Sequence, residues 1–342
     1  MKILHALYSD RKGGLEQAFV NVTRMLLSLG HDVELWVPEK APYLGELEKV
    51  CTRVELRSHG YLDFFALMRH RKNVKKSAPD LIISHNSRAT SLLVNASAGY
   101  KIPHLAFSHG YKTHRFKKVD HVVVLTEDMK KHFMSAGYID KIVSIFPNVI
   151  ERVPDITSRK VPVQGQPIRL GYVGRLNEEK GLEDLLHALA LITNSQRLEL
   201  HIAGSGPDQV LIEDLARKLE ITSSLHFSGW VDDIQSWMNS INLIVVPSRS
   251  ESFGIVVLEA AAYGCPVIAT NVAGPASQVT HKVDGWLAKP CSPKSLAKVI
   301  EYVLQRPESW EAVRQAAYQR AKHYQMDARL KELDAIIHHV TA

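Results

Sequence analysis

Residues 168–192 read IRLGYVGRLNEEKGLEDLLHALALI, and this stretch sets the pattern of the fold. Its first six residues are mostly apolar and predict a buried strand at residues 168–173. A polar loop with two glycines follows, and the apolar spacing of residues 182–192 then predicts a helix. A strand that leads through a short loop into a helix is the repeating unit of an α/β fold with a parallel sheet.

The same alternation of strand and helix continues on both sides of this stretch. On the C-terminal side it predicts further strands and helices, at residues 198–203, 209–219, 225–227, 243–246, 255–263, 266–269, 293–304 and 326–340. On the N-terminal side it predicts one helix and five strands, at residues 15–29 and at residues 3–7, 33–37, 81–83, 105–107 and 121–125. Two successive sets of this kind predict two Rossmann-like α/β domains that face each other across a cleft.

A proline-rich segment separates the two sets. Residues 147–167 contain four prolines, a density at which little regular structure survives. We predict that this segment links a first domain, residues 1–160, to a second domain, residues 161–325. The last helix, residues 326–342, is expected to pack back on the first domain. Ligands of such sheets bind beyond the carboxyl ends of the strands, so the loops there are expected to carry the function.

Composition and charge narrow the class of protein. The 342 residues are 45% hydrophobic and 23% charged, which excludes wholesale disorder. Residues 1–160 carry 25 Lys and Arg against 16 Asp and Glu, whereas residues 161–342 carry 17 against 20. A basic half indicates an anionic partner, which is nucleic acid, anionic lipid or a phosphorylated substrate, although a generic solubilising surface fits the charge as well.

Targeting signals and cysteines bear on the compartment. The chain has no run of 18 apolar residues, and the apolar run at residues 3–7 is too short for a signal peptide. Cys51, Cys265 and Cys291 are scattered and odd in number, which fits a reducing compartment better than a disulfide framework. We therefore expect a cytoplasmic protein, with peripheral association at the inner face of the cytoplasmic membrane as an option.

The strongest chemical signal is SESFGIVVLEA at residues 250–260, directly after a predicted strand. Gly254 permits close approach of the backbone, and the helix that begins beside it offers unpaired N–H groups to phosphate oxygens. The carboxylates of Glu251 and Glu259 can reach one ligand at different depths and accept hydrogen bonds from sugar hydroxyls. A structural interpretation stays open, in which Glu251 interacts with the helix dipole and Glu259 is a solvated surface acid.

A second signal is the loop that joins the strand and helix quoted first. Arg175 and Lys180 lie in this loop at the carboxyl edge of the predicted sheet, and such a pair can neutralise a diphosphate without a metal. Each charge-assisted hydrogen bond contributes about 1.5–3 kcal/mol. The alternative is that both are solvated loop charges, with Lys180 paired to Glu179 or Glu183.

Two glycine pairs are weaker signals. Gly13 and Gly14 precede the first predicted helix, where adjacent glycines allow a ligand to approach the backbone, although such a pair is usually only a turn. Gly204 and Gly206 also follow a strand. Pro207 and the absence of a third glycine argue against a dinucleotide-binding fingerprint there.

Taken together, these motifs resemble the GT-B-fold retaining glycosyltransferases of the family 4 type over nearly the whole chain. The resemblance lies in an ordered series of short motifs, namely Gly13-Gly14, Leu29-Gly30-His31-Asp32-Val33, Val173-Gly174-Arg175-Leu176, Lys180-Gly181, Ala203-Gly204-Ser205-Gly206-Pro207, Glu251 with Glu259, Gly264-Cys265-Pro266-Val267-Ile268-Ala269-Thr270 and Gly285-Trp286-Leu287. The chain departs from the family at Asn148-Val149, where Asn-Gly is usual, and at Pro275-Ala276-Ser277-Gln278, where a second glycine and an acid are frequent.

The resemblance implies roles for individual residues. Arg175 and Lys180 would hold the diphosphate of the sugar donor and stabilise the leaving group, Glu251 would position the transferred sugar, and Glu259 would bind the ribose. His109 matches a family histidine near the donor sugar and the acceptor, which makes His109, Glu251, Arg175 and Lys180 the expected catalytic residues. The expected donor-binding residues are Gly13, Gly14, Arg175, Lys180, Gly204, Glu251, Ser252, Phe253, Gly254, Ile255, Val256 and Glu259.

Histidine has other uses that the pattern leaves open. His109 is also compatible with a structural loop histidine. A zinc site at His104, His109 and His114 is disfavoured, because no helix places side chains with a five-residue period on one face.

The acceptor side is suggested by an aromatic and basic stretch. Residues 61–68, YLDFFALM, run into a cluster of cations, a combination typical of membrane-surface segments, although a core helix with a solvated end fits equally. The candidates for contact with an anionic membrane or a phosphorylated glycolipid are Arg69, Arg71, Lys72, Lys112, Arg115 and Lys118.

The expected activity follows from the resemblance. It is the transfer of a hexose-type sugar, with retention of configuration, from a nucleoside-diphosphate sugar, expected to be UDP-linked, to a cell-envelope glycolipid, lipopolysaccharide or polysaccharide precursor. No cofactor or metal is expected, because the chain has no Asp-x-Asp pair and its cations can supply the charge. A sugar-nucleotide epimerase or phosphorylase on the same fold is an alternative. A basic nucleic-acid-binding protein is another, but no nucleic-acid partner is expected without a recognised binding module.

Overall fold

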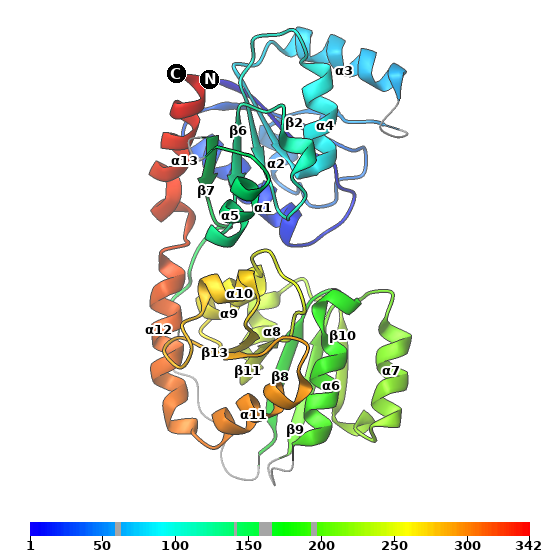
Figure 1. The fold of residues 1–342 in the computed structure, drawn as a ribbon, viewed down its shortest axis with the longest axis vertical. Coiled ribbons are helices and arrows are strands. Elements are labelled where there is room, and N and C mark those ends of the chain that lie inside the picture. Colours follow the sequence, from blue (N-terminus) through cyan, green and yellow to red (C-terminus); the bar gives the residue numbers. More distant parts are fainter. Residues whose placement is uncertain (59–62, 140–141, 157–165, 193–196) are drawn as a thin grey trace. The chain divides into compact units, whose positions relative to one another are not determined.

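The computed structural model describes residues 1–58, 63–139, 142–156, 166–192 and 197–342. These residues form two compact units, which Figure 1 colours along the chain. Unit 1 consists of Met1–Glu151 and Gln325–Ala342, and unit 2 consists of Arg152–Tyr324. The chain thus changes unit inside the predicted linker, whereas the predicted boundary at residues 160 and 161 lies outside the described residues.

Unit 1 is built on a seven-stranded parallel sheet in the order β3-β2-β1-β4-β5-β6-β7. Its strands are β1 (Lys2–Leu7), β2 (Asp32–Val37), β3 (Thr52–Glu55), β4 (Leu81–His85), β5 (His104–Phe107), β6 (His121–Val124) and β7 (Val143–Ile145). Its helices are α1 (Gly14–Ser28), α2 (Leu47–Val50), α3 (Phe64–Ser77), α4 (Asn86–Ala96), α5 (Glu127–Ser135) and α13 (Met326–Thr341). Apolar residues of α1 and α13 pack on one face of the sheet, and those of α3 and α4 pack on the other.

Unit 2 repeats this plan with six parallel strands in the order β10-β9-β8-β11-β12-β13. Its strands are β8 (Ile168–Val173), β9 (Leu198–Ala203), β10 (Leu225–Gly229), β11 (Leu243–Val246), β12 (Val267–Thr270) and β13 (Trp286–Ala288). Its helices are α6 (Leu182–Leu191), α7 (Gln209–Lys218), α8 (Ile234–Asn239), α9 (Ile255–Ala262), α10 (Ala273–Gln278), α11 (Pro293–Leu304) and α12 (Trp310–Lys322). The cores on the two faces of the sheet are separate clusters, one with α6 and α11 and one with α8 and α9.

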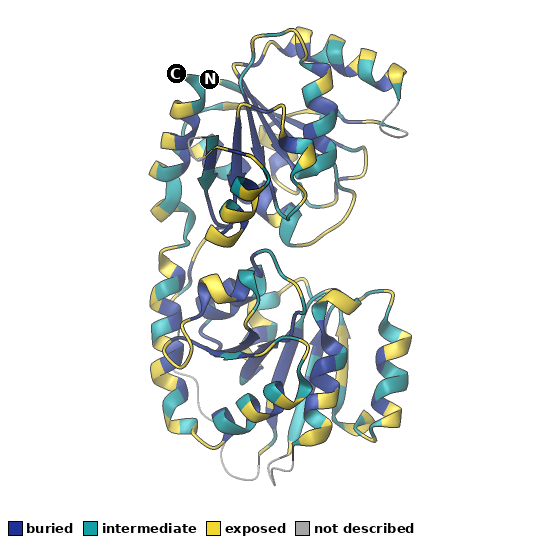
Figure 2. Ribbon diagram, in the orientation of Figure 1, coloured by how far each residue is buried: buried dark blue, intermediate teal, exposed yellow. Residues whose placement is uncertain are grey.

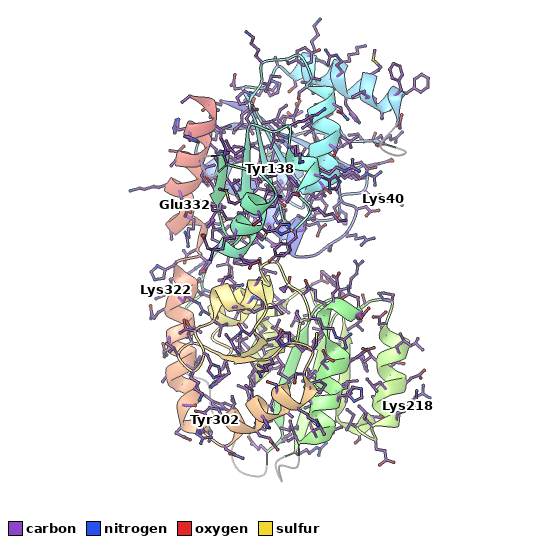
Figure 3. The ribbon with its side chains drawn as sticks, in the orientation of Figure 1. Lys40, Tyr138, Lys218, Tyr302, Lys322 and Glu332 are labelled. Atoms are coloured by element: carbon purple, nitrogen blue, oxygen red, sulfur yellow. The ribbon has the colours of Figure 1, made fainter. Side chains whose placement is uncertain are left out.

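Burial follows the layers. The strands of both sheets are mostly buried, and the helices bury one side and expose the other (Figure 2). Side chains fill the space between strands and helices within each unit (Figure 3). None of the helices in the described residues is long and apolar enough to span a bilayer.

Strand order marks one position in each sheet. In unit 1 the order reverses between β1 and β4, and in unit 2 it reverses between β8 and β11. The carboxyl ends of the two strands at such a reversal diverge into different connections, and ligands of open α/β sheets bind there. The loops after β8 and β11 are the two that carry the strongest sequence motifs.

Candidate functional site

The loops after β8 and β11 are joined by an ion pair. Lys180, at the end of a short 3-10 turn (Glu178–Lys180), donates from Nζ to Oε2 of Glu251 in the loop after β11. Both side chains are partly buried, with 29% and 17% of their surface exposed. The alternative that pairs Lys180 with Glu179 or Glu183 is therefore wrong, because strand pairing brings Glu251 closer than chain neighbours do. Two predicted site residues thus meet at the reversal point of the sheet.

A second cation in the loop after β11, Arg249, was not predicted as a site residue. Its Nε and Nη2 each lie 2.9 Å from the carboxylate oxygens of Asp184, and Nη2 lies 3.1 Å from Glu183. The hydrogen bonds that Arg249 donates to the carboxylate of Asp184 raise the pKa of Arg249 above its ordinary value, so the guanidinium stays charged. Its backbone N–H also donates to the carbonyl of Glu179 at 2.8 Å. Arg249 therefore connects the loop after β11 to the start of α6. It also occupies Glu183 and Asp184, so that Lys180 pairs with Glu251.

Residues of α10 hold the loop that leads into α9 by hydrogen bonds. Gly254 begins α9 with φ +79°, a conformation that favours glycine. The amide of Gln278 donates to the carbonyl of Phe253 and, at 3.3 Å, to that of Gly254. The backbone N–H of Gly274 donates to the carbonyl of Glu251 at 2.9 Å. Gln278 lies in the segment that departs from the family pattern, and its amide holds the loop that leads into α9.

The start of α9 offers a site for an anion. Ser252 and the buried Phe253 precede Gly254, and the first helical residues are Ile255 and Val256. The N–H groups of the first turn of a helix have no acceptor within the helix, and the helix dipole adds partial positive charge there. Phosphate oxygens are the groups that such a helix start binds best.

Arg175 is a free cation at the same edge. Its side chain is exposed, and in the described part of the chain no acceptor pairs with its guanidinium. Its backbone is fixed, because the hydroxyl of Tyr172 donates to its carbonyl at 2.9 Å. A cation on a fixed backbone without a protein partner is available to a ligand.

Glu259 lies in the second turn of α9 and is partly buried. No cation or hydrogen-bond donor pairs with its carboxylate among the described residues. Burial raises the pKa of Glu259 to about 7. The alternative of a solvated surface acid is therefore wrong. A carboxylate that is partly buried and has no partner is costly unless a ligand pairs with it.

The two glycines after β9 have a packing role. Gly204 has φ +137°, and a Cβ there would lie 1.9 Å from the carbonyl oxygen of Gly174. A Cβ on Gly206 would lie 2.1 Å from the carbonyl oxygen of Leu176. These glycines let the loop after β9 lie against the loop that carries Arg175. Donor binding by Gly204 itself stays a prediction.

We expect Gly204→Ala to lower the free energy of unfolding of unit 2 by about 2–5 kcal/mol, since it combines backbone strain with a clash against a fixed carbonyl. The matched control is Gly229→Ala, because Gly229 also has positive φ (+63°) but has open space at its Cβ. That control is expected to cost only about 1–2 kcal/mol. Urea unfolding of both variants measures the difference, and equal losses would contradict a close approach at Gly204.

The predicted site residues of unit 1 lie at the carboxyl edge of its own sheet. Gly13 caps α1, and Gly14 is the first helical residue. His109 follows β5, and its Nε2 lies 2.9 Å from Nδ1 of His85. Burial lowers the pKa of His109 to about 4, so the ring is neutral. The roles of Gly13, Gly14 and His109 toward a ligand stay predictions.

The three histidines weighed as a zinc site have separate partners. His104 bonds through Nε2 to the Ser84 hydroxyl at 2.8 Å, and His114 accepts from its neighbour Arg115 at 3.0 Å. Among the described residues one other group has the composition of a metal site, in unit 2: ligand atoms of Glu199, His201 and His226 lie within 4.8 Å of one another. Arg197 and Arg169 pair with Glu199, at 3.2 and 3.8 Å.

The basic candidates of unit 1 differ in how free they are. Arg69 and Arg71 donate to backbone carbonyls, of Arg57 at 3.2 Å and of Ala98, and Arg71 also lies over the ring of Tyr100. Arg115 donates to Ser91 at 3.4 Å, so it is partly engaged as well. The exposed lysines of this set are Lys72, Lys112 and Lys118.

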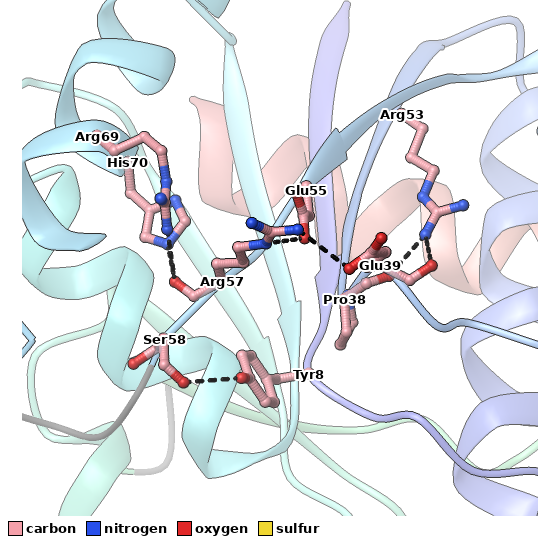
Figure 4. Close-up of polar contacts among 9 residues, drawn as sticks. All are labelled: Tyr8, Pro38, Glu39, Arg53, Glu55, Arg57, Ser58, Arg69 and His70. Atoms are coloured by element: carbon pink, nitrogen blue, oxygen red, sulfur yellow. Dashed lines mark hydrogen bonds and ion pairs between the residues drawn. The ribbon is translucent and has the colours of Figure 1, made fainter. Parts of the chain in front are cut away.

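Helix α3 is attached to unit 1 by its inner side. His70 bonds through Nε2 to the carbonyl of Arg57 at 2.7 Å, and Tyr8 donates to the next carbonyl, of Ser58, at 3.1 Å (Figure 4). Arg57 itself pairs with Glu55 and Glu39. This network fixes the segment under α3, so the outer side of the helix is the side open to a partner. Tyr61 and Leu62 of the predicted aromatic stretch lie outside the described residues.

Comparison with known proteins covers both units. Residues 12–152 match the family model described as Glycosyltransferase Family 4, and residues 155–320 match the model described as Glycosyl transferases group 1. The chain is similar to the lipopolysaccharide core biosynthesis glycosyltransferase LpsE of Rhizobium meliloti, with 23% identity over 89% of each chain. It is also similar to the uncharacterized glycosyltransferase MJ1607 of Methanocaldococcus jannaschii, with 36% identity over 43% of this chain but only 38% of that protein.

A solved structure extends the likeness to the whole fold. The chain is similar to Alr3699/HepE of Anabaena, solved in complex with UDP and glucose, with a TM-score of 0.87 and 18% identity. The match covers 99% of both chains. At this identity the likeness concerns the fold.

Proposed function

We propose a sugar donor and an acceptor for this chain. The premise is that the chain belongs to the glycosyltransferases of the family 4 type and has their GT-B fold. The family models and the structural likeness confirm the family and the fold predicted from the sequence. The proposed reaction is transfer of a hexose-type sugar from UDP to a lipopolysaccharide-type glycolipid, with retention of the anomeric configuration.

The observation that carries the proposal is the pairing of Lys180 with Glu251, in a loop whose other cation, Arg175, has no side-chain partner among the described residues. A diphosphate needs cations, and a sugar needs acceptors for its hydroxyls. The three side chains supply both at the edge where the strand order of unit 2 reverses. Lys180 holds one oxygen of Glu251, so the carboxylate is fixed before the sugar arrives and its remaining lone pairs can accept hydrogen bonds from hydroxyls.

The proposed chemistry is electrostatic. The bond between the sugar C1 and the β-phosphate oxygen breaks, and negative charge builds on the diphosphate. Arg175 and Lys180 stabilise that charge from fixed positions, and such preorganised groups usually provide the largest single contribution to catalysis. The acceptor hydroxyl attacks C1 from the face that UDP leaves, and its proton moves to the departing phosphate oxygen. The products are the glycoside and UDP.

The remaining residues of the edge suit the nucleotide. We assign the N–H groups of Ile255 and Val256 to phosphate oxygens and the partly buried carboxylate of Glu259 to the ribose hydroxyls. His109 does not belong to this edge but to the carboxyl edge of the sheet of unit 1, and we assign its ring to the substrate.

Two relatives support the choice of substrates. The similar Anabaena protein was solved with UDP and glucose, and the similar Rhizobium protein is named for lipopolysaccharide core biosynthesis. A lipopolysaccharide acceptor fits the basic charge of unit 1, and UDP fits the two cations Arg175 and Lys180 of unit 2.

A thermal-shift screen of UDP-, GDP- and ADP-sugars tests the sugar donor. A ligand at about 100 times its Kd adds about 2.7 kcal/mol to the native state, so the bound nucleotide raises Tm. We expect UDP-sugars alone to do so. Mass spectrometry and NMR of a reaction with a lipopolysaccharide acceptor then identify the product and its anomer, with and without EDTA. Turnover of the sugar nucleotide without an acceptor would indicate an epimerase or phosphorylase, and absence of any shift would reject the proposal.

We further propose that α3 docks unit 1 on an anionic membrane that carries the acceptor. Its outer side begins with three apolar residues, Phe64, Phe65 and Met68, which are 64%, 85% and 53% exposed. Cations follow along the helix, and no acid interrupts residues 64–77. Its inner side is buried at Ala66 and Val74, as the core-helix alternative expects, but that alternative leaves the exposed phenyl rings unexplained.

Vesicle sedimentation tests this docking. Lys72→Ala is expected to weaken binding to vesicles with phosphatidylglycerol about 5-fold at low salt, since each cation near such a surface contributes about 1 kcal/mol. Phe65→Ser is expected to weaken it about 10-fold or more, because a buried phenyl contributes about 1.5–3 kcal/mol. The control is Val210→Ser on α7, which removes an apolar side chain that is 65% exposed. Equal binding to neutral vesicles, or equal loss in the control, would contradict the proposal.

A further inference from the structure

Three histidine rings form a cluster in unit 1, in which His5 and His85 are buried and His109, after β5, is partly buried. His85, at the end of β4, stacks on Phe107 with ring centroids 4.5 Å apart and on His109 with centroids 5.1 Å apart. His5 of β1 meets the edge of His85 at 4.9 Å. Because His85 and His109 are also joined by a hydrogen bond, the position of one proton decides what His109 offers to a ligand.

The first ring in the cluster has a defined tautomer. The hydroxyl of Thr23 donates to the carbonyl of Phe19 at 2.9 Å. Its oxygen is then the acceptor in the 3.0 Å contact with Nδ1 of His5, so Nδ1 carries the proton. Burial lowers the pKa of His5 to about 3, which leaves one proton on the ring. Nε2 of His5 is therefore a bare lone pair.

The tautomer of His85 follows from the ring nitrogen that has no partner. Its Nε2 is buried and has no hydrogen-bond partner among the described residues. Burial lowers the pKa of His85 well below its ordinary value, so this ring also carries one proton. An orphaned buried N–H is rarer in proteins than an unfilled acceptor, which places the proton on Nδ1. Nδ1–H of His85 then donates to Nε2 of His109 over 2.9 Å.

This hydrogen bond determines the proton on His109. With Nε2 occupied as an acceptor, the single proton of the neutral ring lies on Nδ1. Nδ1 of His109 has no hydrogen-bond partner among the described residues, and it is not a buried orphan like Nε2 of His85. It is the atom of His109 that is open to a ligand.

We propose that His85 is a positioning residue that holds His109 in the Nδ1–H tautomer, so that His109 presents a hydrogen-bond donor, and not a general base, to the substrate. This inference rests on the proposed function, in which His109 contacts the substrate. The ring of His109 matches an acceptor oxygen of the substrate, such as a sugar hydroxyl or a phosphate oxygen. It does not remove the proton of the acceptor hydroxyl, which agrees with transfer of that proton to the leaving phosphate.

NMR of the full chain labelled with ¹⁵N-histidine tests the tautomer directly. The two ring nitrogens of a neutral histidine have very different shifts in its two tautomers, and the His109→Gln variant assigns the signals of His109. We expect a protonated Nδ1 and a bare Nε2 at pH 7.5. A protonated Nε2 on His109 would overturn the proposal. This measurement needs no substrate, so it is independent of whether the proposed sugar transfer is correct.

Two variants of His85 test its role. In His85→Asn the side-chain amide places an N–H where Nδ1–H was, whereas His85→Leu keeps the volume and removes the donor. We expect the Asn variant to keep the tautomer of His109 and most of kcat. We expect the Leu variant to lose the tautomer and to lower kcat about 10-fold or more.

The matched control is His104→Leu, because His104 is a buried histidine of the same sheet that bonds to Ser84. It is expected to lower stability without changing the tautomer of His109. If the Asn and Leu variants lose kcat equally at equal Tm, or if the Leu variant keeps the tautomer, His85 does not position His109.

Discussion

Replacing Lys180 by alanine is expected to lower kcat about 10²–10³-fold, which corresponds to about 2.7–4 kcal/mol of transition-state stabilisation. Two effects act together. The variant removes a fixed positive charge from the proposed diphosphate site, and it also releases the carboxylate of Glu251 from its ion pair. The second effect distinguishes Lys180 from Arg175, which has no protein partner to release among the described residues.

Loss of stability does not account for an effect of this size. The Lys180–Glu251 pair is partly exposed, and exposed ion pairs contribute about 1 kcal/mol or less to the free energy of unfolding. The control is Lys218→Ala at the end of α7, which removes a cation from the same unit (Figure 3). Its kcat is expected to equal that of the wild type.

A double-mutant cycle separates the two effects of Lys180. If the pair acts as a unit, Lys180→Ala combined with Glu251→Ala costs much less than the sum of the single changes, as groups that act together usually do. Steady-state and single-turnover rates with a UDP-sugar and an acceptor provide the four values. A Lys180→Ala enzyme within about threefold of the wild type would remove Lys180 from the reaction.

The sequence predicts the fold well because its signals are local. Where a strand-to-helix unit has a clear periodicity and glycines or prolines mark its ends, it is recognised from its own residues alone, as β8 and α6 are from residues 168–192. The helices α2, α4, α5, α8, α10 and α12 lack so clear a pattern and are not predicted from the sequence. The short strands β3, β7 and β13 give no such signal. Each of them lies at the edge of its sheet and pairs with a longer neighbouring strand.

The contacts within the site follow from sheet topology, which the sequence does not express locally. Lys180 has acidic neighbours in the chain, yet its partner Glu251 is 71 residues away, because β8 and β11 are adjacent strands. Arg249 is 65 residues from Asp184 for the same reason. In the sequence Glu183 is only a possible partner of Lys180, and nothing local assigns a role to Asp184. Only the fold gives them a cation.

The sequence does not indicate a role for His85, for a related reason. A single histidine at the end of an apolar strand is most often a satisfied core residue, and nothing adjacent in the chain indicates otherwise. Its relation to His109 depends on the pairing of β4 with β5, which sets Phe107 beside His85. Proton positions in such a cluster follow from which atoms find partners, and only the folded chain defines those partners.

The second large effect is expected for Glu259→Gln, which should stabilise the folded protein at pH 8 and weaken its binding of UDP. Burial raises the pKa of Glu259 to about 7. A raised folded-state pKa makes the ionised carboxylate a cost to the native state. This cost is absent below the unfolded pKa, grows as pH rises between the two values, and is complete above pH 7. The Gln variant should therefore be more stable than the wild type at pH 8, by about 1–3 kcal/mol, and no more stable at pH 4.

Binding should change in the other direction. If the carboxylate of Glu259 accepts hydrogen bonds from the ribose, loss of its charge costs about 1.5–3 kcal/mol, so Kd for UDP should rise roughly 10- to 100-fold at pH 8. The affinity of the wild type should also fall as pH drops below 7, since protonation of Glu259 mimics the variant, and the Kd of the Gln variant should lack this pH dependence. Calorimetric titration measures both. The matched ligand is 2′,3′-dideoxy-UDP, which lacks the ribose hydroxyls and should bind wild type and variant alike. A Gln variant that loses affinity for both nucleotides equally would show that Glu259 acts through the loop and not through the ribose, because the only difference between the two ligands is the pair of hydroxyls.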